Sequence, residues 1–337
     1  RDAGPNRGWS PERLQRLAAI NSGAVAHRAQ DLVRARELYH RALAVTAGPT
    51  GLELARTRAN LGSLEYDARD FEAALTADRA AIAQATAALG AGHPLVGQLV
   101  TQEAFALESL GRIEEARSRL ESSTGAWSLI LRSRLDARRR RFAAAQASAT
   151  QALAATDASD VLTRINAETA LADALTDPDA AAARYTAALA RCQATYGEAH
   201  PIHASFRQRA AAGLLRLARP AEALVHLRRA LQIGETLADN DLAATAETRR
   251  LLSDALLALH QPDEALSSAR AAVTLLTDLP GDHALDLALA TRSLGRALLA
   301  HGQATEAANT LQTALAAIET RLDPDDPDLA QTRTELA

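Results

Sequence analysis

The amino-acid sequence predicts an all-α protein built as a solenoid of antiparallel helix pairs. Apolar residues recur at helical spacing, with i, i+1, i+4, i+7 and i+8 on one stripe. One such stripe is formed by Ala223, Leu224, Leu227, Ala230 and Leu231. The whole pattern then recurs along the chain, which is the signature of a repeat architecture. Proline, which fits the first turn of a helix, opens successive units at Pro178, Pro220 and Pro262, 42 residues apart.

Each unit contains one alanine that serves as its reference position. The eight reference alanines are Ala35, Ala74, Ala116, Ala145, Ala181, Ala223, Ala265 and Ala307. A small residue precedes each of them by twelve positions, namely Gly23, Gly62, Ala104, Ser133, Thr169, Ala211, Ser253 and Gly295. Because small side chains let two helices approach closely, we expect these positions to lie where the helices of a pair pack together.

In chain order, residues 1–10 are rich in Gly, Pro and charge and are interpreted as a linker. Ser10 caps the first helix, with Pro11 at its first position. Residues 11–337 are then expected to form about eight repeats, and Leu329–Ala337 a terminal helix. The step between the third and fourth units is only 29 residues. We therefore expect an irregular, tightened connection over residues 121–127, with Trp127 filling the short repeat.

The segments ALGAGHPLVGQ, TYGEAHPIHAS and LDPDDPDLAQ each precede a predicted first helix. They resemble tetratricopeptide repeats (TPR), in the 42-residue variety of kinesin light chains and many bacterial signalling proteins. The resemblance covers roughly Pro11–Ala337 and implies a right-handed TPR superhelix whose first helices line a peptide-binding groove. The aromatic residue that the family often places nine before the reference alanine is missing. Two units carry Glu65 and Asp136 there, and we expect looser packing in both.

Composition and charge argue against several classes of function. The net charge of -4 disfavours nucleic-acid binding, and no apolar run is long enough to span a membrane. All basic residues are Arg, and the run Arg138–Arg141 is interpreted as a solvated helix end rather than a phosphate-binding patch. We expect a cytoplasmic protein that inserts in no membrane.

Catalytic and metal-binding patterns are weak. Cys192 is the single cysteine and is predicted to be a buried small hydrophobe. His93 and His200 each precede a helix-opening proline and are assigned a role in turns. The acidic run Asp323–Asp328 lacks the glycine and the final glutamate of a calcium loop, so it is interpreted as a helix start. We therefore expect no enzyme activity, no metal and no cofactor.

Candidate partner-binding residues come from the first helices. The resemblance implies a role for Asn21 and Asn60, because an asparagine that bonds peptide backbone recurs at their position in kinesin light chains and in carboxylate-clamp chaperone adaptors. A carboxamide both donates and accepts hydrogen bonds, as an extended backbone requires. Arg56 lies one turn before Asn60 and shares its face. The other candidates in the predicted groove are Gln102, Gln208, Arg209, Arg250, Arg292 and Arg296.

These residues lead to a main hypothesis and two alternatives. The main hypothesis is a non-enzymatic scaffold that binds an extended, acidic segment of another protein, because guanidinium groups grip carboxylates in bidentate fashion. One alternative is the regulatory or substrate-recruiting arm of a larger signalling protein, such as a bacterial serine/threonine kinase or a signal-transduction ATPase. It is motivated by the linker-like head and by a first residue that is not Met. A self-assembly module, hence a homo-oligomer, is the other.

Overall fold

The computed structural model describes residues 10–45, 50–236 and 241–336, and over these residues it consists of helices without any strand. The first helices of the pairs are α1 (Pro11–Arg28), α3 (Gly51–Asp67), α5 (Pro94–Ser109), α7 (Ala126–Arg138), α9 (Val161–Asp173), α11 (Pro201–Arg216), α13 (Leu242–Ala258) and α15 (Ala284–Ala300). The second helices are α2 (Leu32–Ala44), α4 (Phe71–Leu89), α6 (Ile113–Arg119), α8 (Phe142–Ala155), α10 (Pro178–Tyr196), α12 (Pro220–Glu235), α14 (Pro262–Thr277) and α16 (Ala304–Glu319). A further helix, α17 (Pro327–Leu336), follows the last pair.

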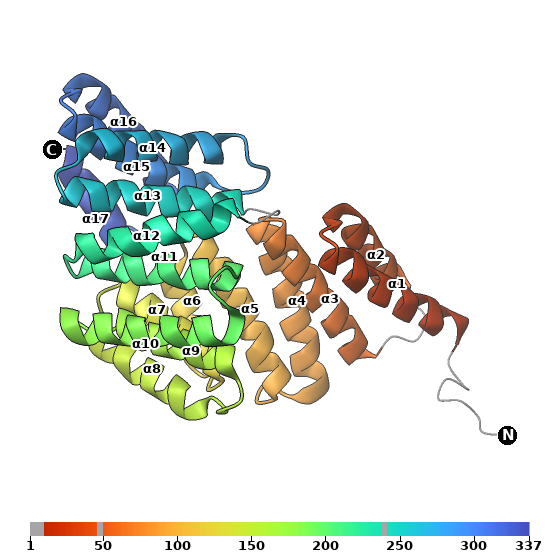
Figure 1. Cartoon of the computed structure of the whole chain (residues 1–337). Helices are drawn as coiled ribbons and strands as arrows, with labels where there is room; N and C mark the ends of the chain where they lie inside the picture. The colour runs from red at the N-terminus through yellow and green to blue at the C-terminus, as the bar shows by residue number, and fades with distance from the viewer. Residues whose placement is uncertain (1–9, 46–49, 237–240, 337) are drawn as a thin grey trace. The chain divides into compact units, whose positions relative to one another are not determined.

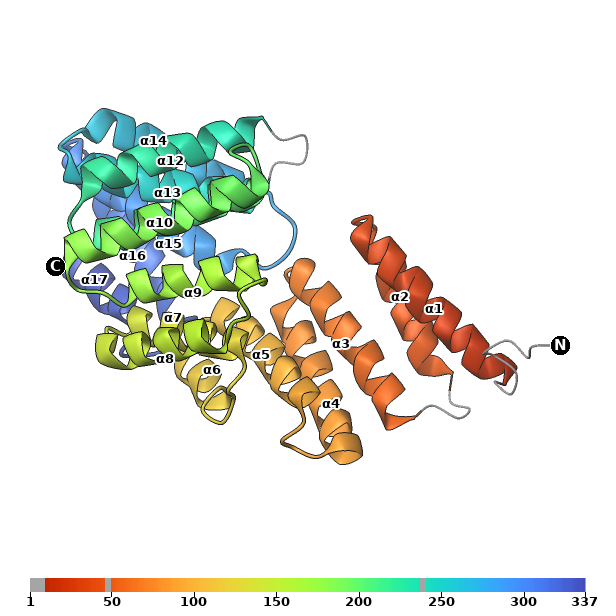
Figure 2. The same cartoon turned by 60° about the horizontal axis from the view of Figure 1, so that its bottom comes forward.

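The chain divides into two compact units, and the division falls in the short third pair. The first unit comprises Arg1–Leu110 and Ser118–Ser123, and the second comprises Gly111–Arg117 and Thr124–Ala337. In each unit the helix pairs follow one another in chain order (Figures 1 and 2). Neighbouring first helices contact each other, as in α1 with α3 and α13 with α15, whereas over the described residues neighbouring second helices make no comparable contact. Each unit therefore has an inner face formed by first helices, and the predicted all-α solenoid of helix pairs is confirmed.

Helix starts follow the local sequence signals. The Ser10 hydroxyl accepts a hydrogen bond from the amide of Arg13 across 3.2 Å, which confirms the predicted cap of α1. His93 and His200 act in the same way through Nδ1, each accepting from the amide two residues later at 3.2 Å. Both histidines precede the proline that begins the helix, so their predicted role in turns is confirmed.

The turn inside each pair uses one repeated backbone conformation. The residue five before the reference alanine has a positive φ in seven of the eight pairs: Gln30, Arg69, Gly111, Arg140, Ala218, His260 and Gly302. In six of these turns, the amide that follows bonds back to the carbonyl five residues earlier, as from Arg219 to Leu214 at 2.9 Å. This left-handed residue ends the first helix and reverses the chain, which usually calls for glycine.

The core confirms the repeat pattern read from the sequence. All eight reference alanines are buried, with at most 1% of their surface exposed. The small residue twelve before them meets a large side chain of the second helix at very short range. A Cβ on Gly23 would lie 2.8 Å from the ring of Tyr39, and one on Gly295 would lie 2.6 Å from Leu311. The predicted close approach of the two helices is thus confirmed at these pairs.

Two expectations about packing were wrong. Glu65 and Asp136 do not loosen their pairs, because both are buried and each is neutralised by an arginine of the preceding second helix. Arg36 pairs with Glu65, and Arg117 lies 2.6 Å from Asp136. Trp127 is 39% exposed, so it is not buried as a filler of the short repeat.

Among the described residues, no helix combines the length and the apolar composition needed to cross a membrane.

Candidate functional site

All nine candidate partner-binding residues lie on first helices, and they divide between the two units. Asn21, Arg56, Asn60 and Gln102 belong to the first unit, on α1, α3 and α5. Gln208, Arg209, Arg250, Arg292 and Arg296 belong to the second unit, on α11, α13 and α15. Each set can therefore contribute to the inner face of its own unit.

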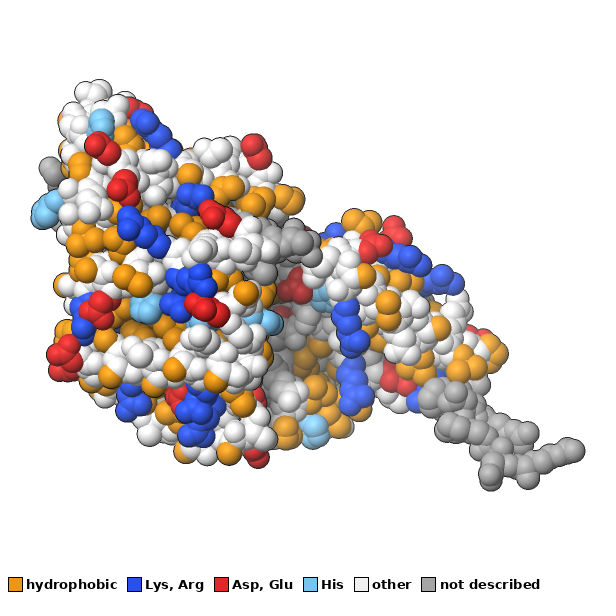
Figure 3. Space-filling model, in the orientation of Figure 1, with side chains coloured by type: hydrophobic (Ala, Val, Ile, Leu, Met, Phe, Trp, Pro, Cys, Tyr) orange, Lys and Arg blue, Asp and Glu red, His pale blue; other side chains and the backbone are white. Residues whose placement is uncertain are grey.

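Three candidates of the first unit carry polar groups with unused bonding capacity. Asn21 and Arg56 are exposed and Asn60 is half-buried, and none of their three side chains makes a hydrogen bond or ion pair with another described residue. Arg56 and Asn60 stand one turn apart on α3, and α1 packs against α3. Basic side chains are visible on the surface over α3 (Figure 3). This region, which we call the open face, consists of Asn21, Arg56 and Asn60.

Gln102 has an internal role instead. Its side-chain amide donates to the carbonyl of Ala59 on α3 and to Asp78 Oδ1 on α4, both at 2.8 Å. It thereby ties three helices together, and these bonds leave its Nε2 with no proton to offer a partner. Asp78 is fully buried, and burial followed by repulsion from Glu103 raises its pKa to about 8.

The arginines of the second unit are engaged with carboxylates of the chain itself. Arg209 lies 2.7 Å from Asp173 on α9, and the hydroxyl of Tyr185 donates to the other oxygen of that carboxylate at 2.6 Å. Over the described residues, Gln208 is the one member of this set whose side chain makes no hydrogen bond or ion pair. In Figure 3 basic and acidic side chains lie next to each other on this unit.

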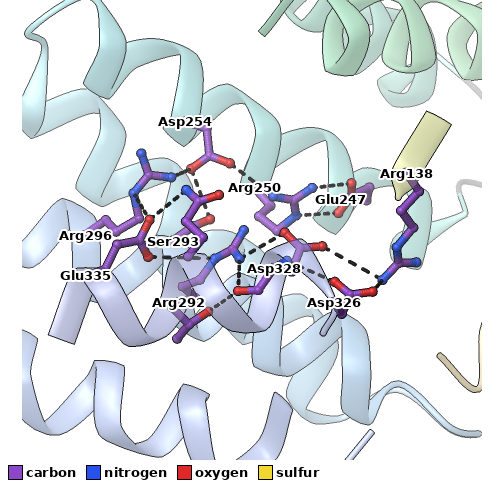
Figure 4. Close-up of polar contacts among 12 residues, drawn as sticks. Arg138, Glu247, Arg250, Asp254, Arg292, Ser293, Arg296, Asp326, Asp328 and Glu335 are labelled. Carbon is purple, nitrogen blue, oxygen red and sulfur yellow. Dashed lines mark hydrogen bonds and ion pairs between the residues drawn. The ribbon is translucent and has the colours of Figure 1, made fainter. Parts of the chain in front are cut away.

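The remaining three arginines form one network along the inner face of the second unit (Figure 4). Arg250 is held by Glu247 at 2.6 Å and by Asp254 at 3.0 Å, both on its own helix. Arg296 joins the next pair to this one, since it lies 2.8 Å from Asp254 and 3.3 Å from Glu335 of α17. Arg292, only 4% exposed, lies 3.0 Å from Asp328 of α17.

The network continues to an acidic turn at the start of α17. We call Asp325, Asp326 and Asp328 the acidic turn. Arg139 binds Asp325 at 2.5 Å, and Arg138 lies 3.6 Å from Asp326 and 3.8 Å from Asp328. The prediction that Arg138–Arg141 is a solvated helix end was therefore wrong for Arg139, whose side chain is only 3% exposed.

The electrostatic effects within this network differ from one carboxyl to the next. Burial raises the pKa of Asp326 above its ordinary value. Burial acts in the same direction on Asp328, but the guanidinium groups of Arg292 and Arg138 outweigh it and hold its pKa below the ordinary value. The hydrogen bond from Arg139 lowers the pKa of Asp325.

The arginine run and the acidic run are both recognisable in the sequence, but their contact was not predicted. Nothing in the local pattern indicates that segments almost 190 residues apart, as Arg139 and Asp325 are, lie side by side. The internal partners Asp173 and Asp254 were also missed. They lie on the preceding first helix, 36 residues before Arg209 and 42 before Arg296, so no single spacing in the sequence indicated both pairs.

The described residues contain no group of three or more His, Cys, Asp or Glu side chains arranged to hold a metal ion. Cys192 is fully buried, as predicted, and burial raises the pKa of its thiol. Burial also lowers the pKa of His203 and His226, the two buried or half-buried histidines near Arg207.

Comparison with known proteins identifies one repeat. A family model described as a tetratricopeptide repeat matches residues 54–95, which span most of α3, all of α4 and the start of α5. No curated protein matches the chain. The match shows a tetratricopeptide repeat over these residues. The TPR assignment of the other repeats, the kinesin-light-chain variety and the bacterial signalling context stay predictions.

Two solved structures illustrate the likeness at the level of whole chains. A complex of the TPR2AB domain of yeast Sti1 with pHSP90 is 14% identical with a TM-score of 0.31, covering 95% of this chain and 96% of that chain. The Cut9–Hcn1 hetero-tetramer of the APC/C is 14% identical with a TM-score of 0.45, covering 99% of this chain and 79% of that chain.

Proposed function

We propose that this tetratricopeptide-repeat protein is a non-enzymatic scaffold, and that the open face of its first unit binds an extended, acidic segment of another protein. The observation that carries the proposal is the unused bonding capacity of Asn21, Arg56 and Asn60. The four candidate arginines of the second unit already hold carboxylates of the chain. Of the nine candidate residues, those whose side chains have no partner among the described residues are therefore the three of the open face and Gln208.

The chemistry of the open face fits an extended backbone beside a carboxylate. Each asparagine side chain offers a donor and an acceptor, which matches one peptide unit of a partner. The guanidinium group of Arg56 is exposed and has no partner in the described chain, so binding a carboxylate breaks no existing ion pair. Arg56 shares its helix face with Asn60, so one segment can reach both.

The spacing of the two asparagines limits the partner further. They stand on neighbouring first helices, and packed helices lie about 8–10 Å apart. An extended chain advances about 3.3 Å per residue. The residues contacted by Asn21 and Asn60 are therefore expected about three positions apart, with the acidic residue near the second of them.

A peptide array tests this proposal on the purified chain. The chain is screened against extended acidic and amidated peptides, together with the variants Asn21→Ala, Arg56→Ala and Asn60→Ala. Arg41→Ala is the matched control, because Arg41 is an exposed arginine on the second helix α2. Capture that is lost in the three variants, retained in the control and selective for acidic peptides supports the proposal. Capture that survives all three substitutions contradicts it.

Two alternatives are a regulatory arm of a larger signalling protein and a self-assembly module. No contact among the described residues bears on either of them, and both stay predictions.

A further inference from the structure

The second unit contains a contact that a linear repeat array does not require. Repeats normally touch only their neighbours in sequence. Here the turn before α17 reaches back to α6 and to the end of α7. The amide of Glu114 donates to Asp323 at 3.3 Å, Arg139 binds Asp325, and a Cβ on Gly111 would lie 2.4 Å from the carbonyl oxygen of Arg321. Residues 321–325 thus lie against the start of α6 and the end of α7.

The acidic turn presents its carboxylates from the start of a helix. Asp326 is fully buried and accepts a hydrogen bond from the amide of Asp328 at 2.9 Å. This geometry delivers two carboxylates, two residues apart, to guanidinium groups from two separate helices. Arg138 comes from α7 and Arg292 from α15. Both arginines are thus arranged around a single acidic helix start.

The fit between these charges is incomplete. Asp326 Oδ2, Arg138 Nη2, Arg139 Nη1 and Arg292 Nε are buried atoms without a hydrogen-bond partner among the described residues. The ion pairs of Asp326 with Arg138 and Arg139 are 3.6 and 3.8 Å long, which is beyond hydrogen-bond distance. Because buried charges without hydrogen bonds cost free energy, a ligand that bonds these atoms directly has an advantage over the internal segment.

We propose that Arg138, Arg139 and Arg292 form a second recognition site, for an acidic helix start of a partner protein. The chain's own residues 321–336 occupy this site as an internal ligand. The partner displaces that ligand by offering two carboxylates at the same spacing, followed by a leucine. The site belongs to the second unit and shares no residue with the open face, so it does not rest on the proposed function.

The partner needs a leucine after its two carboxylates because displacing residues 321–336 exposes Leu329 to water. Leu329 is 2% exposed and packs with Ala288, Ile318 and Leu322. Leaving a buried leucine in water is unfavourable, so a partner without an equivalent side chain cannot compete. The internal ligand also has the advantage of a short tether, which corresponds to an effective concentration on the order of millimolar. Binding in trans is therefore weak until the internal contacts are released.

The test uses the full chain with Asp325→Asn, Asp326→Asn and Asp328→Asn, which we call the open variant. Asparagine at position 326 keeps the ability to cap α17. The probe is a fluorescent synthetic peptide with the sequence of residues 321–336, measured by anisotropy. We expect the open variant to bind it at least about tenfold more tightly than the unmodified chain, because competition from the tethered segment is removed.

Further variants identify the residues that carry the binding. Arg138→Gln in the open variant is expected to weaken peptide binding at least about tenfold, whereas Arg184→Gln, at an exposed arginine of α10, leaves it unchanged. A peptide with asparagine in place of the aspartates at 326 and 328 is expected not to bind. Equal affinity of the open variant and the unmodified chain overturns the proposal, as does binding that is insensitive to Arg138→Gln.

A milder variant keeps the proposal testable if the open variant does not fold. Asp325 has a side chain that is 77% exposed, so Asp325→Asn removes one contact of the acidic turn without touching the core. We expect faster hydrogen exchange in α17, by about threefold or more, with unchanged exchange in α13. Unchanged exchange in α17 contradicts the proposal. Peptide capture at the open face is independent of all these results, so failure of either proposal can be told from failure of the other.

Discussion

Arg139 donates a hydrogen bond from Nη2 to Asp325 Oδ1 at 2.5 Å, although 186 residues separate the two in sequence. Arg139 also holds Glu114 of α6 at 2.8 Å, so one guanidinium group connects α6, the end of α7 and the turn before α17. Stability in a repeat array comes mainly from nearest-neighbour interfaces. This long-range contact therefore couples parts of the second unit that the repeat itself would leave independent.

The buried carboxyl of Asp78 makes the stability of the first unit depend on pH. Its pKa of about 8 lies far above the ordinary value near 3.9, because burial and then Glu103 disfavour the charged form. The folded protein thus keeps a proton that the unfolded chain has already lost. The stabilisation is complete below about pH 4 and is lost as the pH rises through 8, by up to about 1.4 kcal/mol per unit.

The variant Asp78→Asn isolates this effect, because an amide does not titrate. We expect the free energy of unfolding of the unmodified chain, minus that of Asp78→Asn, to fall steadily between pH 5 and about pH 8. Urea unfolding at a series of pH values measures the difference. A difference that stays constant over this range would show that Asp78 is already ionised in the fold.

The turn at Ala218 stores backbone strain that glycine relieves. Ala218 is exposed and has a φ of 57°, where a Cβ is unfavourable by roughly 1–2 kcal/mol. Ala218→Gly is therefore expected to raise the free energy of unfolding by about 1 kcal/mol. The matched reverse change is Gly302→Ala at the equivalent turn, where φ is 88° and a Cβ would touch nothing within 4 Å. It is expected to lower the free energy of unfolding by a similar amount. If both variants are as stable as the parent, the backbone at Ala218 is not strained.

The pair Arg36–Glu65 neutralises a buried carboxylate in the first unit. Glu65 is 5% exposed, so Arg36→Ala leaves its charge buried without a partner. We expect the free energy of unfolding to fall by about 2 kcal/mol. Replacing both residues with leucine is expected to recover most of that loss, because no buried charge remains. Arg41→Ala on the same helix serves as the control and should change stability by less than about 0.5 kcal/mol.

The repeat pattern was enough to predict the helix pairs, their starts and the core alanines. Each of these features depends on residues within one unit, as in the cap at Ser10 or the contact of Gly23 with Tyr39. The packing around Glu65 was mispredicted because the arginine that neutralises it, Arg36, lies 29 residues earlier in the preceding second helix. Periodicity places a residue on a face, but it does not indicate which side chain of the next helix meets it.

For the candidate site, too, the sequence did not indicate which side chains meet. The sequence indicated which residues lie on first helices, and the structure confirms that placement for all nine. It did not indicate that Arg209 and Arg292 are engaged by Asp173 and Asp328, because such pairing depends on the rotation between successive repeats. The open face was therefore identified only by finding which polar groups of the predicted set have no internal partner.

The measurement that tests the scaffold proposal most directly is a double-mutant cycle across the open face. The acidic peptide best captured by the full chain is titrated against the parent and Arg56→Ala, with its acidic residue intact or changed to the amide, at two salt concentrations. We predict a coupling free energy of about 1 kcal/mol or more that shrinks as salt rises, with unchanged helicity. A coupling near zero, with Arg56→Ala binding as tightly as Arg41→Ala, would contradict recognition of an acidic segment at this face.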